Sequence, residues 1–175
     1  MKSLMKIFCA LLIGGSCFFY TAFAQSKKDK KAAKTAEIAR MVNAREYVFK
    51  ATYVTTYRGG GNRSLNYDYD LIVSKDSIIA YLPYFGRAYS SNYGSLDNGI
   101  KFTSTKFDYK VTNKKGSWDI YIVPKDVNTT DANAVLKLNL SVSADGYASL
   151  QIISLNRDPI SFNGYIQERA KSKRN

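Results

Sequence analysis

Apolar and polar residues alternate along this chain with two different periods. Between residues 32 and 45 the apolar positions Ile38, Met41 and Val42 recur at helical spacing, and several alanines favour a helix. From Tyr47 onward the period changes to two residues, which is the spacing of a half-buried strand. The pattern therefore predicts one amphipathic helix followed by a sheet.

The strand pattern is clearest in two segments. Residues 66–73 read NYDYDLIV, in which the aromatic and apolar side chains fall on one face and Asp68 and Asp70 on the other. Residues 134–142 read AVLKLNLSV, in which apolar residues from Leu136 alternate with polar ones. Strands with one polar face are typical of an antiparallel sheet rather than a doubly wound one.

Turn signals rich in glycine, asparagine and lysine separate these runs at short intervals and predict eight or nine strands. Consecutive hairpins of this kind build an up-and-down barrel or a two-sheet sandwich, and the sequence leaves both open. We therefore expect a mainly β fold, an antiparallel meander with one N-terminal helix. The expected strands span residues 47–57, 66–74, 77–83, 99–105, 106–112, 117–123, 134–143, 147–154 and 159–166.

Residues 1–24 have the order of a secretory signal peptide. Lys2 and Lys6 precede an apolar run, and the small-x-small motif AFA ends at Ala24, where we expect cleavage. The run is shorter than the roughly 20 residues that span a bilayer, which disfavours a membrane anchor. A lipoprotein processed at Cys17 is the weaker alternative. We expect export to the periplasm or cell envelope, with no transmembrane segment in the mature chain.

The rest of the chain divides into a basic linker with the amphipathic helix (residues 25–45), a single β domain (46–167) and a basic tail (168–175). The formal net charge of +12 lies mainly at the two ends, because residues 51–164 are close to neutral. A protein that tracks phosphates needs its lysines and arginines along one groove or face. We therefore expect no nucleic acid among its partners.

Composition limits the chemistry of the mature chain. The protein has no histidine, and both cysteines, Cys9 and Cys17, lie in the expected signal peptide. Disulfides, histidine-paired nucleophiles and the nitrogen and sulfur ligands of zinc are thereby excluded. Asp68 and Asp70 have the spacing of a carboxylate dyad, but polar strand faces commonly show it. We expect no catalytic residue, metal or cofactor, and a protein that is not an enzyme.

The tripeptide Asp76-Ser77-Ile78 resembles the O-glycosylation motif that some bacteria use on exported proteins. A turn that leads into a strand explains the same residues equally well. The sequence leaves open whether Ser77 is modified.

The segment YLPYFGRAYSSNYG, residues 81–94, is the densest aromatic stretch of the chain. Tyrosine suits sites where its ring meets an apolar surface and its hydroxyl reaches water. An arginine beside it can stack on the ring or bind an anion. The alternative is that the rings complete the core while the arginine pairs with an aspartate. The segment LNRDPISFNGYI, residues 155–166, offers a second arginine. The candidate ligand-binding residues are Tyr84, Arg87, Tyr89, Tyr93 and Arg157.

These two segments, with YDLIVSKDSI between the first strands and a signal peptide ahead, resemble an uncharacterised family of exported bacterial proteins, domain of unknown function 4251. The likeness covers residues 46–166, and the stretches LPYFGRAY and NRDPISFNGYI are its specific part. The resemblance implies a single β-rich exported domain of a gut-type bacterium. It implies no activity and assigns no catalytic residue.

The function that we expect is non-enzymatic binding of a small-molecule or glycan ligand at a tyrosine-rich rim of the exported domain. The tyrosines would provide stacking and apolar contact, and the arginines would meet an anionic or polar group. The alternative is a structural or protein-interaction module that docks on another envelope protein. The ligand and the oligomeric state are beyond the sequence.

Overall fold

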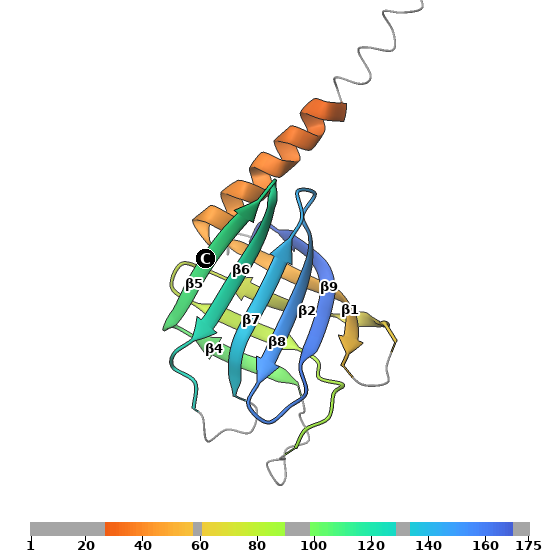
Figure 1. Ribbon diagram of the computed structural model, residues 1–175, viewed down its shortest axis with the longest axis vertical. Helices are drawn as coiled ribbons and strands as arrows, with labels where there is room; N and C mark the ends of the chain where they lie inside the picture. The colour runs from red at the N-terminus through yellow and green to blue at the C-terminus, as the bar shows by residue number, and fades with distance from the viewer. Residues whose placement is uncertain (1–26, 58–60, 90–98, 129–133, 170–175) are drawn as a thin grey trace, which may run out of the picture.

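The computed structural model describes residues 27–57, 61–89, 99–128 and 134–169, in which one helix (residues 27–44) precedes nine strands. The expected number and order of strands are confirmed, and Figure 1 shows them wrapped around a common interior. The expected signal peptide lies outside the described residues. The strands are β1 (Tyr47–Thr56), β2 (Arg63–Val73), β3 (Ile78–Leu82), β4 (Ile100–Ser104), β5 (Phe107–Lys114), β6 (Ser117–Pro124), β7 (Val135–Val142), β8 (Tyr147–Ser154) and β9 (Ile160–Gln167).

All nine strands belong to one antiparallel sheet with the order β4-β3-β2-β1-β9-β8-β7-β6-β5. The sheet curls into a nearly closed barrel, which decides between the barrel and the sandwich (Figure 1). Buried side chains from both halves form one continuous core, including Phe49 and Leu71 from one half and Leu140 and Phe162 from the other. One hydrogen-bonded sheet that encloses this core is a barrel, whereas a sandwich would bury the core between two separate sheets.

The barrel stays open between β4 and β5, although these strands follow each other in sequence. Neighbouring strands alternate in direction across all eight antiparallel pairings, so the first strand of the order, β4, and the last, β5, point in the same direction. A parallel pair needs a crossover of about a dozen residues or more, and only Thr105 and Lys106 separate these strands. Among strands that follow each other in sequence, β4 and β5 are therefore the pair that the sheet does not join by hydrogen bonds.

Asp126 holds the corner where β4 passes into β5. Its carboxylate accepts hydrogen bonds from the Ser104 hydroxyl at 2.5 Å, the Thr105 backbone N–H at 2.8 Å and the Lys106 backbone N–H at 3.2 Å. These donors lower the pKa of Asp126 to about 2, and the Ser104 hydroxyl is the largest cause. The corner is thus stabilised by an ionised carboxylate rather than by strand pairing.

The helix closes one end of the barrel with its last turns. Ile38, Met41 and Val42 are fully buried in the common core, as the helical spacing predicts, while the first turns project away from the barrel (Figure 1). Tyr109 of β5 donates its hydroxyl to the carbonyl of Val42 at 3.3 Å. The guanidinium of Arg45 lies 4.8 Å from the centre of the Tyr109 ring. The helix therefore packs against β5, beside the open seam.

β1 contains a bulge that shapes the outer wall of the barrel. Its pairing with β9 shifts between Ala51 and Tyr53, so Thr52 is the extra residue against β9. Against β2 the excess lies on the other strand, because residues 65–68 of β2 face Thr52 alone. Its hydroxyl donates to the carbonyl of Asn163 at 3.0 Å. Gly164 lies opposite, and a Cβ there would lie 2.9 Å from the carbonyl carbon of Lys50 and closer still to its oxygen. Only glycine permits this approach of the two backbones.

A second bulge corrects one sequence expectation in β7. The pairing of β7 with β8 shifts between Val135 and Lys137, so Leu136 falls out of phase with the leucines that follow it. Val135 is buried in the core, and Leu136 is partly exposed. Leu138 and the later alternate residues of the strand are buried as expected.

Candidate functional site

The fold brings the two candidate segments together at the end of the barrel opposite the helix (Figure 1). Ala88 and Arg157 form an antiparallel bridge. The N–H of Tyr89 donates to the carbonyl of Asn156 at 2.8 Å, and the N–H of Asp158 donates to the carbonyl of Arg87 at 3.0 Å. Residues about 70 positions apart thus share one small ladder, as expected if both segments belong to one rim.

The inner layer of this rim consists of Tyr84 and Arg157. The guanidinium carbon of Arg157 lies 4.6 Å from the centre of the Tyr84 ring, and the Arg157 side chain is 6% exposed. The Tyr84 hydroxyl donates to the carbonyls of Arg87 at 2.8 Å and Asp158 at 3.0 Å. Burial, followed by the charge of Asp158, raises the pKa of Tyr84, so this hydroxyl remains a donor. Both side chains hold the loop together.

The outer layer consists of Arg87 and Tyr89. The Tyr89 ring is 59% exposed, although its hydroxyl donates to the Asp158 carboxylate at 2.6 Å. Arg87 is exposed, and its guanidinium carbon lies 5.7 Å from the centre of the Tyr89 ring. We call Tyr84, Arg87, Tyr89, Arg157 and Asp158 the rim cluster. Tyr93, the remaining candidate, lies outside the described residues.

Neither sequence interpretation of the aromatic segment describes it completely. Tyr81 and Phe85 are 45% and 42% exposed, so they do not complete the core. Tyr84 does pack partly against the core, and Asp158 is the aspartate that joins the two layers. The inner layer of the segment therefore packs against the barrel, and the outer layer is exposed.

Asp68 and Asp70 lie on the outer wall beside a lysine. The Lys50 ammonium nitrogen lies 2.9 Å from an Asp70 carboxylate oxygen and 3.7 Å from one of Asp68. The pKa of Lys50 is raised, chiefly by its hydrogen bond to Asp70. Within the described residues, no group of three or more histidine, cysteine, aspartate or glutamate side chains is placed to hold a metal ion.

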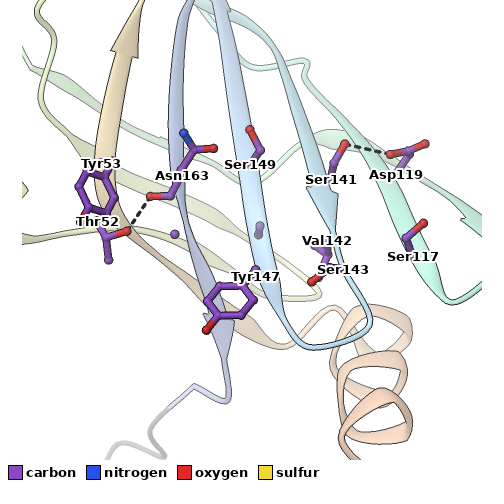
Figure 2. Close-up of a pocket in the computed structure, with 12 residues that line it drawn as sticks. Thr52, Tyr53, Ser117, Asp119, Ser141, Val142, Ser143, Tyr147, Ser149 and Asn163 are labelled. Carbon is purple, nitrogen blue, oxygen red and sulfur yellow. Dashed lines mark hydrogen bonds between the residues drawn. The ribbon is translucent and has the colours of Figure 1, made fainter. Parts of the chain in front are cut away.

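A hollow on the outer wall, which the sequence did not reveal, lies across β1 and β6–β9 near the end that carries the helix (Figure 2). Its volume is about 550 Å³, and its walls carry hydroxyl, amide and carboxylate groups with two tyrosine rings. A polar row crosses its floor in register from strand to strand. The row is Asp119, Ser141, Ser149, Asn163 and Tyr53.

A second hollow of about 650 Å³ lies on the other side of Thr52, over β1, β2 and β9, with Lys50, Tyr67 and Tyr165 among its walls. Both hollows adjoin the β1 bulge. One sequence signal points to that bulge, Gly164 inside a strand. Which polar residues become neighbours depends on strand register, which this signal does not provide.

Within the described residues, no helix has the length and apolar character needed to cross a membrane.

Comparison with known proteins places the whole folded region in one family. A family model for a domain of unknown function, DUF4251, matches residues 29–166. The crystal structure of a DUF4251 family protein from Bacteroides eggerthii DSM 20697 is similar, with a TM-score of 0.56 and 15% sequence identity, covering 79% of this chain and 91% of that chain. That likeness bears on the fold alone. No curated protein matches the chain. The chain belongs to the DUF4251 family.

Proposed function

We propose that this chain is an exported, non-enzymatic binding domain of the periplasm or cell envelope, whose ligand contacts Arg87 and Tyr89 at the rim. The observation that supports the proposal is the fixed position of an exposed ring. Asp158 holds the Tyr89 hydroxyl at 2.6 Å while 59% of the side chain stays exposed. Little conformational entropy is then lost when a ligand covers the ring, which favours binding.

The rim suits a ligand that combines an apolar face with an anionic or polar group. Arg87 lies beside the Tyr89 ring and is exposed, so it can stack against a flat group or pair with a negative one. The carboxylates of Asp158 and Asp70 already have hydrogen-bond partners. Asp158 accepts a hydrogen bond from Tyr89, and Asp70 accepts one from Lys50. A role in binding therefore agrees better with these contacts than general acid or base catalysis does.

Native mass spectrometry of the chain from Gln25 onward, purified gently from the envelope of its own bacterium, tests this proposal. We expect a reproducible non-covalent adduct that is lost in both Tyr89→Ala and Arg87→Ala. Tyr57→Ala is the matched control, because Tyr57 is also exposed, at 74%, but lies outside the rim cluster. An adduct that survives both rim substitutions would contradict the proposal.

The alternative is a protein-interaction module. The open barrel edges are poorly suited to docking by strand addition, because β4 has only five residues and β5 carries Asp108, Lys110 and Lys114. A protein partner would therefore use the rim as well. A photo-crosslinker at position 89, used in the native envelope, distinguishes the two: a discrete protein adduct favours the alternative, and its absence favours a small ligand.

A further inference from the structure

We infer that the outer-wall hollow over β1 and β6–β9 is a second binding site, and that it takes a linear, neutral oligosaccharide. This site is separate from the rim cluster. It lies near the end of the barrel that carries the helix, where Thr35 reaches the turn between β7 and β8, whereas the rim lies at the other end of β8.

The first argument comes from the groups that remain available in the hollow. Within the described residues, the side chains of Ser149 and Asn163 make no hydrogen bond, and Figure 2 shows them projecting from neighbouring strands. The Ser143 hydroxyl is buried at the wall and also lacks a partner in the described part of the chain. Hydroxyl and carboxamide groups both donate and accept, which matches the hydroxyl groups of a sugar.

The second argument comes from the aromatic side chains. Tyr53 and Tyr147 line the hollow and are 48% and 72% exposed, and Figure 2 shows both rings on the same side as Asn163. A pyranose ring has an apolar C–H face and a polar rim. An exposed tyrosine ring can cover the first while neighbouring amides and hydroxyls bind the second.

The third argument concerns charge and length. Asp119 is the one charged side chain among the residues that line the hollow. It accepts from Lys114 at 3.0 Å and from Ser141 at 2.9 Å, so its charge is already compensated. The polar row crosses five strands, and four interstrand spacings of roughly 4.8 Å give about 19 Å. A neutral and extended ligand fits this row better than a single sugar or an ion.

The test is an amide chemical-shift titration of the whole chain from Gln25 onward. The probes are maltohexaose, cellohexaose, xylohexaose, mannohexaose and chitohexaose, each up to about 10 mM, a concentration at which dissociation constants in the millimolar range are measurable. We expect at least one probe to shift the signals of Ser149, Asn163 and their strand neighbours. We expect Asn163→Ala and Tyr147→Ala each to weaken that binding by about tenfold or more, equivalent to about 1.4 kcal/mol.

Two controls separate this site from other surfaces. Tyr57→Ala removes a tyrosine as exposed as Tyr147 but outside the hollow, and should leave the affinity unchanged. Tyr89→Ala removes the rim ring and should also leave it unchanged. Absence of shifts with all five probes overturns the inference, and so does binding that survives both hollow substitutions. Binding that is lost in Tyr89→Ala instead would overturn this inference while supporting the rim proposal.

Discussion

Replacing Gly164 by alanine tests whether the close approach of β1 and β9 is built into the fold. A Cβ at this position would lie 2.9 Å from the carbonyl carbon of Lys50 and 3.2 Å from the Cα of Ala51, whereas relaxed carbon contacts lie at about 3.5–4.0 Å. All these neighbours are backbone atoms in the middle of the sheet, so no side chain can rotate away. The strands themselves must separate.

The expected loss of stability follows from this geometry. Overpacking costs about 1–3 kcal/mol, and each stretched ladder hydrogen bond adds about 0.5–1.5 kcal/mol, so we expect about 2–4 kcal/mol. For a chain of this size that loss corresponds to a fall in Tm of about 5–15 °C. The sign of the change in the free energy of unfolding is informative, because replacing glycine by alanine at an unstrained position stabilises a protein by about 0.4–1 kcal/mol.

Urea unfolding followed by Trp118 fluorescence measures the change, since Trp118 is the single tryptophan and is 3% exposed. Gly61→Ala is the matched control, because a Cβ at Gly61 would meet nothing within 4 Å. The reasoning is refuted if Gly164→Ala is as stable as the unchanged protein or more stable. A similar loss of stability in Gly61→Ala would show that the effect is not specific to the bulge.

Two further predictions concern pH. Burial raises the pKa of Tyr109 to about 12, and burial also raises the pKa of Tyr47, whose hydroxyl lies 3.1 Å from that of Tyr109, well above its usual value. The phenols of the unfolded chain ionise at lower pH than these two, so the stabilisation should be fully present below about pH 10 and be lost as the pH rises towards 12. Urea unfolding across this range should show that the free energy of unfolding falls less steeply with pH in Tyr109→Phe. Asp126 has a pKa lowered to about 2, so its contribution should be present above about pH 4 and be lost as the pH falls to 2. Acid unfolding of Asp126→Asn should lack this component, and an unchanged profile would contradict the role assigned to the carboxylate at the β4–β5 corner.

Most of the fold is predictable because local patterns encode it. Alternation of period two places the nine strands within a few residues of their positions, and helical spacing identifies Ile38, Met41 and Val42 as the buried stripe. The position of the open seam is not encoded locally. It depends on β1 pairing with β9, and residues so far apart leave no periodic signal in either strand.

The candidate site is predictable only in part, for a related reason. The density of tyrosine and arginine identifies the rim segments. It does not predict that Arg157 is buried against Tyr84 whereas Arg87 is exposed. Burial of an arginine depends on the packing of two distant loops. The outer-wall hollow is harder still to predict, because serines and asparagines on a strand resemble any solvated face until the register aligns them.

The pairing of the first strand with the last also sets the moment at which the sheet can be completed. Thr52 and Asn163, which meet across this pair, are 111 residues apart in sequence. Until β9 is available, β1 has an unpaired edge and the two halves of the sheet cannot join. Contacts between such distant residues slow folding, because a long loop must close before they form. In a chain exported as proposed, the sheet would thus be completed only after the C-terminal strand had crossed the membrane, in the compartment where the protein acts.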